Sequence, residues 1–320
     1  MGAGCIAIGE RQELVSNLRI LLAAVSAIVL FLYGLEAFSR EIQAVGGETL
    51  AKWLNRLTES RWRAVLLGTV ATAIVQSSSA VSSLVVAFVD AGTMTFRSSL
   101  GVLLGANIGT TSTAWLVSLK LTGIGPFFII FGTVLGALPT RFKMLGKAAF
   151  YFGFIFFSLD VVSATLKPLA QNPVFAEILG RSSTPLMGVL AGAVITALVQ
   201  SSSITTGVCI LLVQQDILAG YAAIPIVIGA NIGTTATALV ASIKMQKTAR
   251  RVAVANLCFN TFGVLLFLPF LGWFSVEVVK FAGEPSMAVA WGQVIFNVVM
   301  SIAVLIMLRI FQRPLSRIGA

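Results

Sequence analysis

Long apolar runs separated by short polar stretches dominate the chain. A helix needs about 20 apolar residues to cross the roughly 30 Å hydrocarbon core of a bilayer. Runs near this length lie at residues 20–38, 98–119, 148–166, 222–243, 252–274 and 287–308, and a shorter one lies at 125–138. The pattern predicts an all-α polytopic membrane protein.

Two further apolar runs, at residues 64–90 and 186–218, are each interrupted by the tetrapeptide Gln-Ser-Ser-Ser. A straight helix over residues 64–90 would reach about 40 Å at 1.5 Å per residue, well beyond the hydrocarbon core. Two half-length helices that meet at the serines fit better. We therefore expect two re-entrant hairpins, which are tolerated where the irregular tip is buried in protein or faces water.

The two interruptions belong to an internal duplication. Gln-Ser-Ser-Ser occupies residues 76–79 and 200–203, and Gly-Ala-Asn-Ile-Gly-Thr-Thr follows each copy, at residues 105–111 and 229–235. Both motifs repeat at an offset of 124 residues, and 21 of the 53 positions aligned without a gap between Gly68 and Lys120 are identical to their counterparts. A fixed repeat of this kind indicates two copies of one structural unit.

The duplication suggests a domain organisation. We expect an N-terminal segment at 1–19 without a removable signal peptide. The first repeat, at 20–120, contains a span, an interfacial helix around the amphipathic stretch Leu50–Leu57, the hairpin 64–90 and the span 98–119. A connecting span at 121–143 leads to the second repeat at 144–244, which contains a span, a loop, the hairpin 186–218 and the span 222–243, and two C-terminal spans with a short tail follow at 245–320. Three crossings then separate equivalent points of the repeats. An odd number inverts the second copy, as in many secondary transporters.

Composition and charge agree with a membrane protein. The chain is 57% hydrophobic and 11% charged, with a mean hydropathy of +0.96. Its net charge of +10 does not require nucleic-acid binding, because basic residues retained on the cytoplasmic side produce the same excess. The predicted topology puts 16 Lys and Arg residues on the side reached by the first span and 6 on the other. We therefore expect a multi-pass cell-membrane protein with its N-terminus outside and its C-terminus in the cytoplasm. Counting both hairpins as full crossings gives 15 against 7, so the tally predicts orientation but not re-entrance.

Enzymatic chemistry has little support in the sequence. There are three scattered cysteines and no histidine, which leaves no zinc spacing, no disulfide framework and no Cys/His nucleophile. An enzyme acting on phosphorylated lipid would need an acid/base pair or a metal cluster. We expect a protein that is not an enzyme and has no cofactor.

The two Gln-Ser-Ser-Ser tips carry the most distinctive chemistry. Free N–H groups at a helix N-terminus attract anions, and free carbonyls at a C-terminus attract cations. Serine hydroxyls can donate to an oxyanion or accept a cation, and glutamine adds one carbonyl and two donors. Two tips brought together would form a neutral cage for a small anion and a hard cation such as Na⁺. The second motif could line the same cavity with Asn107, Thr110, Thr111, Asn231, Thr234 and Thr235.

Simpler interpretations exist for several of these residues. A single Ser or Thr in a membrane helix commonly serves packing or interhelical hydrogen bonding, and the glycines of the second motif suit a structural role. Glu36 and Asp160 are equivalent positions near helix ends, and an intramembrane carboxylate can mark an ion path. Arg40 is a ready partner for Glu36 at i+4. The i, i+4 pairs Asn256/Asn260 and Gln293/Asn297 suit either interhelical hydrogen bonding or a permeation path.

The paired motifs resemble those of the type II sodium-dependent phosphate cotransporters, bacterial branch. The resemblance implies an inverted-repeat transporter whose hairpin tips hold inorganic phosphate and contribute to sodium sites. By motif, it implies phosphate contacts for Ser77, Ser78, Ser79, Ser201, Ser202 and Ser203, to which we add Asn107 and Asn231. It implies sodium contacts for Gln76, Gln200, Thr110, Thr111, Thr234 and Thr235, to which we add the acids Glu36 and Asp160.

Later spans of the family often carry His-x-x-Phe-Asn. The same frames here read Asn256-Leu-Cys-Phe-Asn260 and Gln293-Val-Ile-Phe-Asn297, which argues against a proton-linked role at that position. Some bacterial members add a soluble regulatory domain, and we expect no such regulation in cis.

These observations predict sodium-coupled symport of inorganic phosphate by alternating access, with Na⁺, phosphate and the bilayer as partners. A carrier of sulfate or another small oxyanion is one alternative, because serine and N–H donors alone do not dictate which tetrahedral anion fits. A passive anion channel built from the same cage is another.

Overall fold

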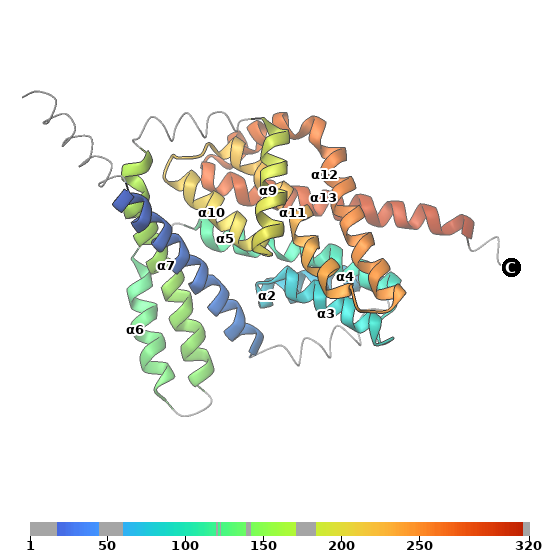
Figure 1. Cartoon of the computed structure of the whole chain (residues 1–320), viewed down its shortest axis with the longest axis horizontal. Helices are drawn as coiled ribbons and strands as arrows, with labels where there is room; N and C mark the ends of the chain where they lie inside the picture. The colour runs from blue at the N-terminus through green and yellow to red at the C-terminus, as the bar shows by residue number, and fades with distance from the viewer. Residues whose placement is uncertain are drawn as a thin grey trace, which may run out of the picture. The chain divides into compact units, whose positions relative to one another are not determined.

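The computed structural model describes residues 18–44, 60–119, 121, 123–138, 142–170 and 184–315 (Figure 1). All regular secondary structure in these residues is helical. Six stretches are long and apolar enough to cross a membrane: Leu18–Ala44, Phe96–Ser118, Lys143–Thr165, Gly220–Ser242, Lys247–Ala282 and Pro285–Leu308. The predicted all-α polytopic fold is confirmed. The expected interfacial helix at Leu50–Leu57, the start of the N-terminal segment and most of the loop before the second hairpin lie outside the described residues.

The duplication appears in the helix boundaries. The first copy contains α2 (Arg61–Val75), α3 (Ser78–Asp90), α4 (Phe96–Gly109) and α5 (Thr111–Ser118), and the second contains α9 (Pro185–Val199), α10 (Ser202–Gln214) and α11 (Gly220–Ser242). Every matching boundary differs by 124 residues. The sequence repeat is therefore a repeat of backbone structure, while its inversion across the membrane stays a prediction.

Both apolar runs break at the Gln-Ser-Ser-Ser motif. Gln76 ends α2 in the left-handed region, with φ 56° and ψ 25°, and Gln200 ends α9 with φ 58° and ψ 24°. Non-glycine residues adopt this conformation at a cost. Ser77 is extended, with φ −150°, and caps α3. One helix thus ends and the next begins within two residues, as predicted for half-length helices.

The second motif behaves differently in the two copies. The first copy is interrupted at Thr110, between α4 and α5, whereas α11 continues through its copy of the motif. The glycines set the packing distance: a Cβ on Gly105 would lie 2.0 Å from the carbonyl oxygen of Val65, and a Cβ on Gly229 would lie 2.1 Å from that of Val189. Only glycine permits this approach of α4 to α2 and of α11 to α9.

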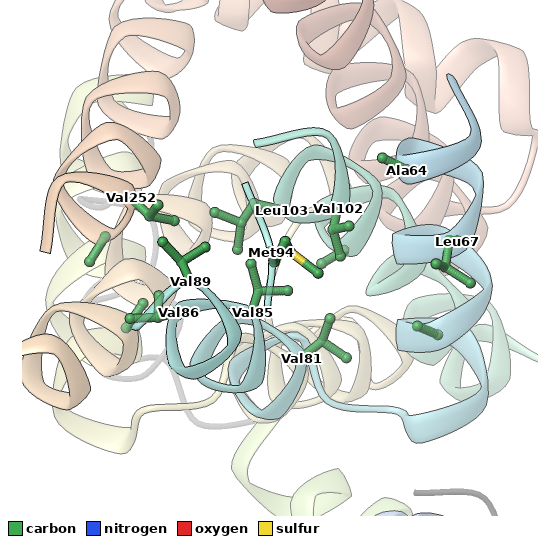
Figure 2. Packing of buried hydrophobic residues seen from close by; sticks show 14 of the residues in the cluster. Ala64, Leu67, Val81, Val85, Val86, Val89, Met94, Val102, Leu103 and Val252 are labelled. Carbon is green, nitrogen blue, oxygen red and sulfur yellow. The ribbon is translucent and has the colours of Figure 1, made fainter. Parts of the chain in front are cut away.

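The chain divides into two compact units. The larger comprises residues 42–119, 182–210 and 219–320, and therefore holds both tips. Its last two helices are α12 (Lys247–Ala282) and α13 (Pro285–Leu315). One of its cores gathers buried side chains from α2, α3, α4 and α12 (Figure 2), among them Leu67, Val81, Val85, Val89, Val102, Leu103 and Val252. This core supports the first tip.

The smaller unit comprises residues 1–41, 120–181 and 211–218. Its helices α6 (Ile124–Gly136) and α7 (Lys143–Ala170) run antiparallel, and a Cβ on Gly132 would lie 2.2 Å from the backbone nitrogen of Phe150. With 13 residues, α6 is about 20 Å long, which is shorter than the full crossing expected from the connecting segment.

Candidate functional site

The two tips contact each other within the larger unit. The Ser79 hydroxyl donates a hydrogen bond to the backbone carbonyl of Gln200 over 3.1 Å. On the other side, the hydroxyls of Thr113 and Ser203 lie 3.4 Å apart. Motifs separated by 124 positions in the sequence thus form one polar cluster.

Each tip joins a helix C-terminus to a helix N-terminus. The hydroxyl of Ser77 accepts from the backbone N–H of Ala80 at 3.2 Å, and that of Ser201 accepts from Ile204 at 3.4 Å. These caps satisfy one N–H at the start of α3 and of α10. The adjoining Ser78 and Ser202 are buried. The remaining end groups make the cluster attractive to both charges, with N–H groups for an anion and carbonyls for a cation.

The two glutamines have different surroundings. The Gln76 side chain donates to the hydroxyl of Ser112 at 2.9 Å and accepts from Thr113 at 2.9 Å. Gln200 is exposed, and its side-chain amide makes no hydrogen bond to the described residues. The counterpart of Ser112 is Ala236, which has no hydroxyl to offer. The first glutamine is therefore held in place, and the second is available to a ligand.

Buried threonines behind the tips were not predicted from the sequence. Thr196 and Thr205 are hydrogen-bonded to each other at 2.7 Å. In the first copy, Val81 replaces the partner, and the Thr72 hydroxyl is buried without a hydrogen bond among the described residues. The Thr206 hydroxyl is likewise buried without a hydrogen bond among the described residues. A buried unpaired hydroxyl is uncommon and marks a place where a ligand or water can bind. In the sequence, the difference between Val81 and Thr205 at equivalent positions was the signal that could have indicated the unpaired Thr72.

The threonines of the second motif bond to their own helices. Their hydroxyls donate to backbone carbonyls three or four residues earlier: Thr110 to Ala106 at 2.9 Å, Thr111 to Ile108 at 2.7 Å, Thr234 to Ala230 at 2.9 Å and Thr235 to Ile232 at 2.7 Å. A hydroxyl that has given its proton to a carbonyl keeps only lone pairs for other partners. These four side chains can therefore act toward a ligand as acceptors, which suits a cation.

Asn107 lies in a cluster of amides formed with α12 and α13. It donates to the side-chain oxygen of Asn260 at 2.9 Å, and its backbone carbonyl accepts from Asn297 at 2.9 Å. Asn260 donates in turn to the backbone carbonyl of Asn256 at 2.9 Å. The equivalent Asn231 instead donates to Ile228 on its own helix at 3.2 Å. Asn260 and Asn297 thus make interhelical hydrogen bonds to Asn107. The side chains of Asn107 and Asn231 have different partners although their motifs are identical.

The predicted acids lie in the smaller unit, and each has a local partner there. Glu36 forms an exposed ion pair with Arg40. Asp160 accepts from the backbone N–H of Gly123 at 3.3 Å. Among the described residues, no three Asp, Glu or Cys side chains gather as a metal cluster. A cation at the tips would accordingly be held by neutral oxygens.

The contacts of Thr113 yield a test of how the tips are held. Thr113→Val removes the hydroxyl that bonds Gln76 and leaves the half-buried side-chain oxygen of that glutamine without this partner. The loss of one hydrogen bond should reduce the free energy of unfolding by about 0.5–1.5 kcal/mol. The matched control is Thr237→Val at the equivalent position, where the hydroxyl bonds only to the Thr234 carbonyl of its own helix. Thermal unfolding of the purified proteins in one detergent measures both. Equal losses would show that the contacts of Thr113 with Gln76 and Ser203 add no stability.

Comparisons with known proteins indicate the family of the chain. The sequence profile described as Na⁺/Pi-cotransporter matches residues 30–164 and 157–270. The chain is 30% identical over 297 residues to the uncharacterized protein YqeW of Bacillus subtilis, covering 92% of this chain and 96% of that one. It is 28% identical over 291 residues to YjbB of Escherichia coli K12, which carries the provisional name of inorganic phosphate export protein; the match covers 89% of this chain and 53% of YjbB.

Human sodium-dependent phosphate transport protein 2B is 34% identical over 146 residues, which are 42% of this chain and 21% of that protein. The chain thus spans about half the length of YjbB and matches a smaller part of the human protein. No solved structure matches it significantly. The family profile nonetheless covers both copies of the repeat, including both tips, and a multi-pass membrane protein with this match belongs to the Na⁺/Pi-cotransporter family.

Proposed function

We propose that the protein moves inorganic phosphate across the cell membrane together with Na⁺, by alternating access, and that the two tips hold both ions. Family membership supports the choice of phosphate and sodium. The observation that carries the proposal is the contact between the tips, where the Ser79 hydroxyl donates to the backbone carbonyl of Gln200 at the end of α9. One cluster there presents donors for an anion beside acceptors for a cation.

Phosphate is assigned to the serines at the two helix starts. The residues are Ser77, Ser78 and Ser79 at α3 and Ser201, Ser202 and Ser203 at α10. Their hydroxyls and the N–H groups of the first turns can surround an oxyanion without a cationic side chain. Asn107 and Asn231 have weaker support as phosphate contacts, since both amides already donate to other oxygens.

Sodium is assigned to the neutral oxygens beside the phosphate site. Gln200 is the strongest candidate because its amide lacks a protein partner among the described residues, and Gln76 supplies the equivalent carbonyl from a fixed position. Thr110, Thr111, Thr234 and Thr235 contribute lone pairs. Glu36 and Asp160 have less support, because their carboxylates have partners in the smaller unit.

Two features leave a second candidate open within the same chemistry. The relative YjbB is named for phosphate export, so outward movement is an alternative direction for this chain. Serine hydroxyls and backbone N–H groups can also donate hydrogen bonds to other tetrahedral oxyanions, so sulfate is the alternative cargo. The uptake experiment distinguishes these cases.

Uptake into proteoliposomes tests sodium coupling. With ³²P-phosphate outside, an inward Na⁺ gradient should concentrate phosphate in the lumen, and replacing Na⁺ by choline should abolish this accumulation because the cation site is then empty. Arsenate, which resembles phosphate in shape and charge, should compete better than sulfate. Phosphate that only equilibrates, with or without Na⁺, would indicate a passive channel. Loss of preloaded phosphate against its gradient would indicate export.

The excess of basic residues on one side predicts the orientation of the hairpins. Arg63 and Arg97 flank the first hairpin and are expected to lie in the cytoplasm. Single cysteines at these two positions should be protected in intact cells from a membrane-impermeant thiol reagent. Cysteines at Pro185 and Gly220 of the second hairpin should react, because the inverted copy opens outward. The background lacks native cysteines. The same reactivity for both pairs would refute the inverted arrangement.

Substitution of the tip serines separates binding from packing. A hydroxyl that hydrogen-bonds a charged ligand contributes about 1.5–3 kcal/mol, or roughly 10–150-fold in affinity, whereas a packing hydroxyl in a membrane helix contributes about 0.6 kcal/mol to stability. Ser→Ala at Ser77, Ser78, Ser201 or Ser202 should raise the half-saturating phosphate or Na⁺ concentration at least about tenfold at one or more positions.

The measurement is uptake kinetics in both ions at matched amounts of folded protein. Ser99→Ala is the control, because Ser99 lies outside both motifs and its hydroxyl bonds only to the Phe96 carbonyl. If all four tip variants stay within about threefold of the parent, which is under 1 kcal/mol, the tips serve packing.

A further inference from the structure

A groove at the start of α12 combines three cations with an apolar wall. We call it the basic groove. It is lined by Phe96, Lys247, Arg250, Arg251, Val254, Ala255, Cys258 and Phe259, and its volume is about 620 Å³. All of these residues belong to the larger unit. None of them is among the predicted phosphate or sodium contacts.

The exposed face of α12 changes character along its length. Lys247, Arg251, Val254 and Cys258 recur at intervals of three or four residues, which places them on one face of the helix. The cations occupy the first turns. Exposed apolar side chains follow, with Val254 at 45% and Leu265 and Leu266 above 50% exposure. From Arg251 to Leu266 the helix rises roughly 22 Å, which is the scale of an acyl chain in one leaflet.

The positive charge of the groove is not neutralised by nearby acids. The carboxylate of Asp90 accepts from the backbone N–H of Gln246 at 2.6 Å and so caps α12 rather than pairing with a cation. Arg250 donates to the backbone carbonyl of Ile243. Lys247 and Arg251 form no ion pair with the described residues. The Asp90 carboxylate offsets the positive end of the α12 dipole, so the charge of the groove comes from its three cationic side chains.

A ligand for this groove needs an anionic headgroup at the helix start and a long apolar chain beside Val254 and Cys258. Free phosphate would satisfy the cations and leave the apolar wall uncovered. A zwitterionic lipid would cover the wall but carries no net charge for three cations. Basic pockets beside membrane helices on the cytoplasmic side bind anionic lipid headgroups. We propose that the basic groove is a binding site for an anionic phospholipid of the cytoplasmic leaflet.

Cys258 is a built-in reporter for this site. Its thiol lines the groove and is exposed, whereas Cys209 is buried. In a Cys5→Ser background, the rate of alkylation of Cys258 by N-ethylmaleimide is measured in detergent at increasing phosphatidylglycerol or phosphatidylcholine. We expect phosphatidylglycerol to slow the reaction at concentrations at least about fivefold below those needed for phosphatidylcholine. Each surface cation contributes about a fivefold preference for an anionic lipid.

Charge variants locate the effect. Lys247→Gln with Arg251→Gln should raise the protecting phosphatidylglycerol concentration about 25-fold, the product of two such contributions. The matched control is Lys143→Gln with Lys244→Gln, which removes the same charge from exposed residues that do not line the groove. The control should protect like the parent. Native mass spectrometry of the parent and the groove variant provides a second readout, with retained phosphatidylglycerol expected only on the parent.

Three results would overturn the proposal: equal protection by both lipids, an equal effect of the control and groove variants, or protection by inorganic phosphate alone. The last would identify the groove as a site for the free anion. Neither readout depends on transport, so the lipid site can fail while phosphate uptake persists, and the reverse.

Discussion

Backbone groups at helix ends inside a membrane must find partners, because hydrocarbon offers none. This constraint explains the construction of the tips. Gln76 and Gln200 close one helix in a left-handed conformation, and Ser77 and Ser201 cap the next. One of the groups that remain is satisfied by the other copy, because Ser79 donates to the carbonyl of Gln200. A break that would be costly in isolation is stabilised by its counterpart, and the same polar groups are those that we propose to bind an anion and a cation.

The close packing of the flanking helices keeps the tips in register. Gly105 and Gly229 bring α4 and α11 against the carbonyls of Val65 and Val189 at distances that no Cβ would permit. Each repeat therefore carries two motifs: Gln-Ser-Ser-Ser forms the polar break, and the glycines of the second motif allow the close helix packing that supports it. Helices that bring their backbones together through small residues are typical of membrane proteins, where apolar side chains gain little by leaving lipid for one another.

The two copies share their helix boundaries and differ in their hydrogen-bond partners. Substitutions of Ser112 by Ala236 and of Val81 by Thr205 between the repeats leave Gln76 held and Gln200 available, and leave Thr72 unpaired where Thr196 is satisfied. Such differences allow one tip to favour the anion and the other the cation. Symmetric scaffolds with asymmetric side chains provide a route by which a duplicated segment can bind two unlike ions side by side.

The sequence by itself determined the helical class, the two breaks and the 124-residue repeat, because apolar run length and identical motifs are local properties. It also indicated the family, through paired motifs that are specific in combination. Only the tertiary structure decided which polar side chains already have partners. Asn107 and Asn231 occupy identical motifs, yet one bonds to Asn260 on another helix and the other to its own helix. Hydrogen-bond satisfaction is a property of the packed molecule rather than of any segment, and the partner of Asn107 lies more than 150 residues further along the chain.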